Sequence, residues 1–309
     1  MKLLKPKFWD QNQFSIFSIL LYPITLIFKI VIFFKYSFTK KYKSSIPVIC
    51  VGNIYLGGTG KTPFCIELFS ILKSLDKNPA FIRKKYKSFQ DEMLLLKRIG
   101  PLFEENKRIN ALNNAILNEH NVAIFDDGFQ DVSIKKDMSI ICFNEKQWIG
   151  NGFVIPSGPL REDLSVLCRA SLVIINGEKN LKIEQKILEK NKQIKIFYIK
   201  YKLTNISGLK NKNIISFAGI GNPINFFSLL KESNINSLEE ISFPDHYNYS
   251  DKELEKLIKK AKDKNAILLT TEKDYVRIND RFKENIKYTK LIIEVENRNQ
   301  LIGEIKKIL

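Results

Sequence analysis

The sequence predicts an α/β protein built on a doubly wound, mostly parallel β-sheet. Two observations predict it. From residue 46 onward, short continuous apolar runs alternate with helical patterns, and such runs suit parallel strands covered on both faces. A glycine-rich segment follows the first apolar run and opens a helical pattern, as a strand, a loop and a helix do in these folds. The predicted strands are 46–51, 122–125, 138–143, 172–175, 195–199, 214–218, 267–270 and 291–295.

Helix signals lie between these strands. A helical pattern covers 62–75, another opens at Asn222-Pro223, and Ser250-Asp251-Lys252-Glu253 has the spacing of a capping box. The chain has 309 residues, which exceeds the usual size of a single hydrophobic core, so we expect one large domain or two closely packed domains. The expected parts are an N-terminal membrane-associated segment (1–44), a core domain (45–205) and a smaller α/β lobe (206–309) packed on the core.

Residues 14–34 form an apolar run that is interrupted only by Lys29 and contains Pro23. The run is about as long as a helix that crosses a hydrocarbon core, so we expect it to contact a membrane. Lysines lie on both sides of it, so its flanks do not decide whether it spans the bilayer or lies on its surface. A long buried core helix remains the alternative, because Lys29 is costly at the centre of a bilayer.

The chain is strongly basic, with 50 Lys and Arg against 33 Asp and Glu and a net charge of +17. This balance favours anionic partners, although scattered surface lysines would give the same charge without a function. No nucleic-acid-binding signature accompanies the charge, so we expect no nucleic acid partner, and no protein partner is evident. The four cysteines are far apart and form no C-x-x-C pair, which argues against a zinc site.

The most specific motif is Gly57-Gly58-Thr59-Gly60-Lys61-Thr62, which lies between a predicted strand and a predicted helix. Glycines let backbone N–H groups surround phosphate, Lys61 adds a positive charge, and the Thr62 hydroxyl can bind Mg²⁺. Tyr55 occupies the first glycine position of the usual pattern, so the spacing is not the standard one. The motif nevertheless predicts a P-loop that binds ATP with Mg²⁺.

A P-loop needs an acidic group on a neighbouring strand to hold Mg²⁺ directly or through water. Asp126 and Asp127 follow the predicted strand 122–125 and are our expected carboxylates on the magnesium side. Two aspartates before a glycine more often mark a turn at a strand end, so only their combination with the P-loop supports the prediction.

These motifs resemble those of the tetraacyldisaccharide 4'-kinase family, the lipid A 4'-kinases of the bacterial inner membrane. The resemblance covers nearly the whole chain and includes an N-terminal membrane-associated helix. It rests on Val51-Gly52-Asn53 with the P-loop and Pro63, Asp126-Asp127-Gly128-Phe129-Gln130, Gly150-Asn151-Gly152, Pro156-Ser157-Gly158-Pro159-Leu160-Arg161-Glu162, Ala218-Gly219-Ile220-Gly221-Asn222-Pro223, Phe243-Pro244-Asp245-His246 and Thr271-Glu272-Lys273-Asp274.

The resemblance implies a P-loop NTPase-like kinase that transfers the γ-phosphoryl group of ATP to the 4'-hydroxyl of a tetraacylated glucosamine disaccharide. The reaction would need Mg²⁺ and would take place at the cytoplasmic face of the inner membrane. Asp91 matches the family's proposed base, and His246 matches the histidine that supports it. The family's other active-site positions fall on Tyr86, Glu92, Arg108, Asp127, Gln130, Arg161 and Glu162. Arg108 and Arg161 could neutralise phosphoryl charge, and Glu162 could act near magnesium.

The chain departs from the family pattern near the expected substrate side. Lys84-Lys85-Tyr86-Lys87 replaces a segment like R-G-Y-G, Asp131 replaces the usual histidine, and Gln90 and Met93 flank the acidic pair in place of glycine and proline. We therefore expect the loop near the substrate to be shaped differently from that of the family.

Other interpretations remain open on the residues alone. Asp91 and Glu92 open a predicted helix, where acidic residues often offset the helix dipole, and His246 could be an ordinary loop histidine. A P-loop GTPase or ATPase switch is an alternative function, although the chain lacks the N-K-x-D element of guanine recognition. A nucleotide-dependent membrane tether is a second alternative, and it would not need Asp91 or His246.

Overall fold

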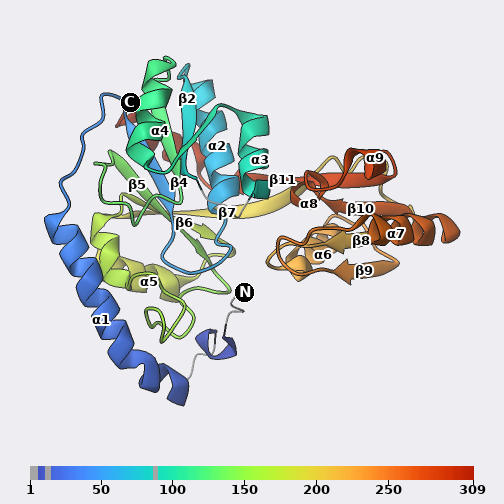
Figure 1. Cartoon of the computed structure of the whole chain (residues 1–309), viewed down its shortest axis with the longest axis horizontal. Coiled ribbons are helices and arrows are strands. Elements are labelled where there is room, and N and C mark those ends of the chain that lie inside the picture. The colour runs from blue at the N-terminus through green and yellow to red at the C-terminus, as the bar shows by residue number, and fades with distance from the viewer. Residues whose placement is uncertain (1–5, 11–14, 86–89) are drawn as a thin grey trace. The chain divides into compact units, whose positions relative to one another are not determined.

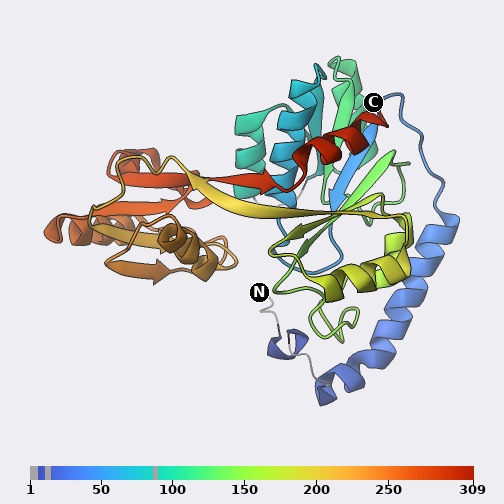
Figure 2. The ribbon, with the colours of Figure 1, turned by 180° about the vertical axis from the view of Figure 1, so that it is seen from behind.

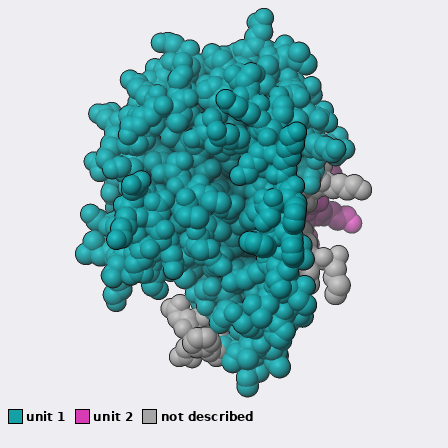
Figure 3. Space-filling model, turned by 90° about the vertical axis from the view of Figure 1, so that its left-hand side faces the viewer, with its two compact units in different colours: residues 1–85, 101–200, 295–309 teal, residues 86–100, 201–294 magenta. Residues whose placement is uncertain are grey.

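The computed structural model describes residues 6–10, 15–85 and 90–309, with only the backbone given for Gln90 and Asp91. The chain forms two compact units, which Figure 3 colours separately. The first contains the chain up to Lys85, Pro101–Lys200 and Val295–Leu309, and the second contains Tyr86–Gly100 and Tyr201–Glu294.

This division differs from the expected boundary at residues 205 and 206 in two places. The C-terminal helix α10 (Arg298–Lys306) belongs to the first unit, where Leu301 and Ile305 are fully buried and Arg298 pairs with Glu67 at 2.9 Å. The helix α3 (Gln90–Ile99), which lies within the expected core domain, belongs to the second unit instead.

The sheet of the first unit is parallel in every strand pair that follows, with the order β3-β2-β4-β1-β5-β6-β7. Its register aligns Val51 of β1 with both Asp126 of β4 and Ile140 of β5, so the carboxyl ends of β1 and β4 are level. β1, β4 and most of β5 are buried, as continuous apolar runs predict. The strands are β1 (Val48–Gly52), β2 (Pro79–Lys84), β3 (Leu102–Glu105), β4 (Val122–Asp126), β5 (Met138–Asn144), β6 (Leu172–Asn176) and β7 (Lys195–Thr204).

Helices cover both faces of this sheet. α2 (Lys61–Ser74) and α4 (Arg108–Leu117) lie on one face (Figure 1), and α10 lies on the other, as the reverse view shows (Figure 2). The predicted α/β fold with a mostly parallel sheet is thus confirmed. The unit also contains the 3₁₀ helices η1 (Lys7–Trp9) and η2 (Leu164–Arg169) and the helix α5 (Leu181–Lys190).

The N-terminal helix α1 (Ile16–Phe38) runs along the outside of the first unit (Figure 1). By length and composition it could cross a membrane, yet its buried residues are the polar Ser18 and Thr25. Its large apolar side chains face outward instead, and a soluble protein seldom exposes so many together. The exposed apolar residues of α1 include Ile16, Phe17, Ile19, Leu20, Ile24, Leu26, Ile27, Ile30, Val31, Phe33, Phe34 and Phe38.

The second unit contains a parallel sheet in the order β11-β10-β8-β9. Separate apolar clusters include residues of α6 on one side and of α7 on the other. α7 begins with the predicted capping box of Ser250 and Glu253. The elements are β8 (Ile214–Ala218), α6 (Pro223–Glu232), β9 (Glu239–Ser242), α7 (Asp251–Asp263), β10 (Ile267–Thr271), α8 (Glu272–Tyr275), α9 (Asp280–Lys283) and β11 (Ile286–Val295), together with α3.

Candidate active site

The glycine-rich segment forms a loop between β1 and α2, as the sequence predicts. Gly57 (φ 141°) and Gly60 (φ 91°) adopt backbone angles that strain any residue with a side chain, so both positions require glycine. α2 begins at Lys61, and Thr62 follows in its first turn. Because the unpaired N–H groups at the start of a helix attract anions, this loop can hold phosphate groups.

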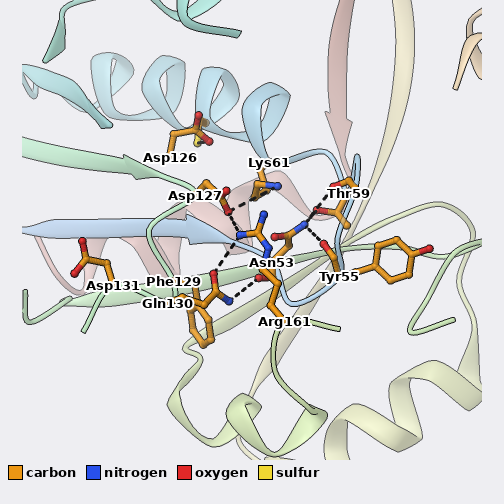
Figure 4. Close-up of polar contacts among 12 residues, drawn as sticks. Asn53, Tyr55, Thr59, Lys61, Asp126, Asp127, Phe129, Gln130, Asp131 and Arg161 are labelled. Atoms are coloured by element: carbon orange, nitrogen blue, oxygen red, sulfur yellow. Dashed lines mark hydrogen bonds and ion pairs between the residues drawn. The ribbon is translucent and has the colours of Figure 1, made fainter. Parts of the chain in front are cut away.

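A buried side chain fixes the shape of this loop. Asn53 follows β1, and its amide group donates hydrogen bonds to the Tyr55 carbonyl (2.6 Å), the Gly57 carbonyl (3.3 Å) and the Thr59 hydroxyl (3.0 Å; Figure 4). Asn53 belongs to a motif that supports the family resemblance, but its role in holding the loop was not predicted. Its partners become visible only once the path of the loop is known.

The two aspartates at the end of β4 face in different directions (Figure 4). Asp126 is buried and lies 3.6 Å from Arg83, measured between Oδ2 and Nη1. Asp127 faces the phosphate loop, and its Oδ1 lies 2.7 Å from Arg161 Nη1 and 3.9 Å from Lys61 Nζ. Burial alone would raise the pKa of Asp127, but the charges of Lys61 and Arg161 lower it to about 2. Asp127 is therefore an ionised carboxylate beside the P-loop.

Backbone hydrogen bonds join the phosphate loop to the segment that carries Arg161. The N–H of Leu56 donates to the Pro159 carbonyl (2.8 Å), and the N–H of Arg161 donates to the Ile54 carbonyl (2.6 Å). The Arg161 side chain also donates to Gln130 Oε1 at 3.3 Å. These bonds place Arg161 next to Asp127, the carboxylate that also lies beside Lys61. Arg161 and Lys61 are about a hundred residues apart in the sequence.

Arg108 holds the turn that contains the two aspartates. It is buried at the start of α4, and its Nη2 donates to the Asp127 carbonyl at 2.7 Å. Its Nη1 lies 3.1 Å from Asp131 Oδ2. Burial would raise the pKa of Asp131, but hydrogen bonds from Ser133 and the charge of Arg108 lower it. The unusual Asp131 thus supplies a negative partner for a buried arginine.

Glu162 is buried next to Arg161. Its Oε2 lies 2.7 Å from Nη2 of Arg169, a residue to which the sequence assigned no role. Its other oxygen, Oε1, is also buried and accepts no hydrogen bond from any residue that the structure describes. A buried carboxylate oxygen of this kind is a possible cation ligand.

Three sequence motifs of the second unit meet around His246. The fully buried Asp274 accepts hydrogen bonds from the Gly219 N–H (3.1 Å) and from the hydroxyls of Tyr249 (2.8 Å) and Thr271 (2.7 Å). The Gly219 carbonyl accepts in turn from the N–H of His246 (3.1 Å). Asp274 therefore fixes the loop that presents His246, a structural role that the sequence alone did not reveal.

The family model described as Tetraacyldisaccharide-1-P 4'-kinase matches residues 17–309. The chain belongs to the tetraacyldisaccharide-1-P 4'-kinase family. The kinase resemblance inferred from the motifs is thereby confirmed.

Individual members of the kinase family match the chain over almost its whole length. A tetraacyldisaccharide 4'-kinase of Pelagibacter ubique (strain HTCC1062) is 43% identical, and the match covers 100% of this chain and 99% of the relative. That of Rickettsia akari (strain Hartford) is 34% identical over 99% of this chain and 98% of its own. The crystal structure of "apo" form LpxK from Aquifex aeolicus in complex with ATP is 26% identical, has a TM-score of 0.75, and covers 94% of this chain and 99% of its own.

The remaining expected site residues of this 4'-kinase family member are only partly described. Tyr86 lies outside the described residues, and Asp91 is described only by its backbone in the first turn of α3. The neighbouring Glu92 is half-buried. His246 Nε2 lies 3.6 Å from Asp245 Oδ2. The pairing expected between Asp91 and His246 therefore stays a prediction.

The residues beside the P-loop of this family member suit a magnesium ion that is held together with a nucleotide. Among the described residues, no three His, Cys, Asp or Glu side chains are grouped so that they could hold a metal ion alone. A nucleotide-bound Mg²⁺ needs only one or two protein carboxylates, because phosphate and water supply its other ligands. The buried Oε1 of Glu162 and the ionised Asp127 meet this requirement.

Proposed function

We propose that this chain transfers the γ-phosphoryl group of ATP to the 4'-hydroxyl of a tetraacylated glucosamine disaccharide. The product would be the 4'-phosphorylated lipid A precursor of lipopolysaccharide biosynthesis. The observation that carries the proposal is the group of charges at the P-loop, where Asp127 lies between Lys61 (3.9 Å) and Arg161 (2.7 Å). Membership of the 4'-kinase family supports the choice of substrate.

The P-loop residues would hold the ATP phosphates and stabilise the charge that moves between them. The backbone of residues 57–62 would surround the β- and γ-phosphates, while Lys61 and Arg161 neutralise negative charge on the transferring group. Arg108 would act by holding Asp127 and Asp131 in place, because its guanidinium already donates hydrogen bonds to both residues.

Thr62 and the neighbouring carboxylates would form the protein side of the magnesium site. The residues proposed for it are Thr62, Asp126, Asp127 and Glu162. When bound, Mg²⁺ would neutralise charge on the β- and γ-phosphates. Among these carboxylates, Asp127 and Glu162 are better suited to bind Mg²⁺, because Asp126 already pairs with Arg83.

Asp91 would accept the proton of the sugar hydroxyl, and His246 would orient Asp91 or tune its charge. General bases of this kind contribute typically about 10² to 10⁴ in rate. Tyr86, Glu92 and Gln130 would line the substrate side. Gln130 is already held near the P-loop, because its amide donates to the Asn53 carbonyl at 2.9 Å.

α1 would bring the enzyme to its lipid substrate at the cytoplasmic face of the inner membrane. Its inner side is held by polar contacts between Ser18 and Asn151 (3.1 Å), between Thr25 and Ser157 (2.8 Å), and between Lys29 and Asp163 (2.9 Å). Since these contacts fasten the helix along its length to the first unit, we infer that α1 lies on the bilayer and does not cross it. Its outward apolar side chains would enter the lipid.

Nucleotide turnover with and without lipid separates this proposal from the two alternatives. A kinase should consume ATP slowly alone and much faster when tetraacyl disaccharide is added in detergent micelles. A switch should hydrolyse nucleotide at a rate that the disaccharide does not change, and a tether should barely hydrolyse it. Turnover independent of the disaccharide would contradict the proposal.

A further inference from the structure

We propose that Arg169 positions Glu162 for its role beside the P-loop, and that Tyr36 of α1 holds Arg169 in place. The membrane helix would then be a part of the active site as well as an anchor. This inference rests on the proposed kinase function, and it concerns residues to which neither the sequence motifs nor the family resemblance assigns a role.

The first observation is the environment of Glu162. Its side chain is 4% exposed, and the guanidinium of Arg169 is its partner at 2.7 Å. A buried carboxylate that loses the cation paired with it is left with an uncompensated charge, which is strongly unfavourable. Removing Arg169 should therefore displace Glu162, although Arg169 itself would touch no substrate.

The second observation is that Arg169 is held between two aromatic rings. Its Cζ lies 4.3 Å from the ring centroid of Tyr36 in α1 and 5.0 Å from that of Phe129. Phe129 belongs to the D-D-G-F-Q motif and packs so tightly on β1 that a Cβ at Gly52 would lie 2.4 Å from its own Cβ. One ring is thus fixed by the sheet, and the other comes from the membrane helix.

The third observation is that α1 contacts other segments of the site as well. Lys35 Nζ lies 3.5 Å from the Gln130 carbonyl, and Lys29 pairs with Asp163, the residue after Glu162. A cavity of about 250 Å³ lies between α1 and Arg161. It is lined by Phe28, Ile32, Lys35, Tyr36, Gln130, Ile155 and Arg161. α1 is therefore one wall of the space next to Arg161.

The test compares Arg169→Met with Arg298→Met, which removes an arginine that pairs with a carboxylate of the same unit elsewhere. We expect Arg169→Met to lower kcat about 10- to 100-fold and to raise the Mg²⁺ concentration needed for half-maximal activity, as loss of a residue that supports a metal ligand usually does. Calorimetry with a non-hydrolysable ATP analogue should show a smaller gain in affinity on adding Mg²⁺, with unchanged affinity in its absence. Arg298→Met should resemble the wild type.

A double-mutant cycle decides whether Arg169 acts through Glu162. If it does, Arg169→Met combined with Glu162→Gln should be no more than about threefold worse than Glu162→Gln alone. Fully multiplicative losses, or an Arg169→Met enzyme with native kcat and Mg²⁺ response, would overturn the proposal. Should Arg169→Met melt below the assay temperature, Arg169→Lys takes its place in the same cycle with the same expected coupling.

The contribution of α1 is tested in detergent micelles, where membrane binding does not limit the rate. Tyr36→Ala should lower kcat about 3- to 10-fold through loss of a cation–π contact, whereas Phe33→Ala removes an outward ring of the same helix and should leave kcat unchanged. Equal effects of the two substitutions would overturn the role of Tyr36. Wild-type phosphoryl transfer to the disaccharide is measured in parallel, so a failure of this inference is distinguishable from a failure of the proposed function.

Discussion

Asp127 shows how single residues at this site acquire their charge. A carboxylate with little exposure would usually be a poor anion, yet Lys61 and Arg161 lower its pKa to about 2. The positive φ of Asp127 (53°) turns its side chain out of the line of β4, away from the direction of Asp126. Two adjacent and chemically identical residues thus have different surroundings, which the sequence could not distinguish.

The lowered pKa predicts a pH dependence of stability. Because the pKa in the folded protein lies below the ordinary value of 3.8 that the unfolded chain has, the ionised Asp127 stabilises the fold above about pH 4. This contribution, roughly 2 kcal/mol, should disappear as the pH falls through about 2. Denaturant unfolding of wild type and Asp127→Asn between pH 2 and 7 would measure it. A difference between the two proteins that is the same at every pH would contradict the assignment.

Lys61→Ala should abolish phosphoryl transfer without unfolding the protein. The Lys61 side chain is largely buried beside Asp127, and in the reaction its charge would stabilise the transferring group. We expect a loss of at least about 10³-fold in kcat, with a circular dichroism spectrum and melting temperature close to the wild type. A folded variant that keeps near-native activity would rule out the P-loop assignment.

Asp91 and His246 should act as one catalytic unit. Asp91→Asn should lower kcat about 10²- to 10⁴-fold while ATP binding stays largely intact, because a general base serves the acceptor hydroxyl. If His246 works through Asp91, the double variant Asp91→Asn with His246→Ala should be little worse than the more damaging single change. Steady-state kinetics of the three variants would decide it, and independent roles would appear as multiplicative losses.

The helix α1 buries polar side chains and exposes apolar ones, which is the reverse of a surface helix in a soluble protein. Ser18 and Thr25 lie inward, whereas apolar residues such as Ile27 and Phe34 lie outward. The sequence predicted the membrane contact from the length of the apolar run. It could not choose between spanning the bilayer and lying on it, since that choice depends on polar contacts with residues more than a hundred positions away.

Outward charges on α1 should release the enzyme from membranes without unfolding it. Ile27→Glu with Val31→Glu places two carboxylates on the exposed side, and burying them in lipid is unfavourable. We expect the variant to leave the membrane fraction while its activity on substrate in detergent micelles remains near the wild type. Unchanged membrane binding would contradict the anchor, whereas weak residual binding through the basic surface would agree with it.

Other elements escaped prediction for identifiable reasons. The strands β2 and β3 were not predicted, because β2 contains Arg83 and Lys84 and β3 contains Glu104 and Glu105, which break the apolar pattern. Arg83 is nevertheless buried against Asp126. A buried ion pair between segments far apart in the sequence cannot be recognised before the sheet order is known.

For the whole molecule, the sequence predicted the α/β fold, the P-loop and the kinase family correctly. The unit boundaries differ from those expected, because α10 packs in the first unit through the buried Leu301 and Ile305, while α3 belongs to the second unit. In the candidate site, the motif residues Lys61 and Arg161 both lie beside Asp127. The sequence did not predict the structural roles of Asn53, Asp274 and Arg169, because each role depends on contacts with residues that are known only from the fold.

The most direct test of the central claim follows labelled γ-phosphate from ATP to a tetraacyl disaccharide in micelles with Mg²⁺. We expect a labelled lipid that carries one new phosphate, located at the 4' position by mass spectrometry or ³¹P NMR, and no labelled lipid with Lys61→Ala. Release of the label only as inorganic phosphate, or a phosphate on another hydroxyl, would contradict it.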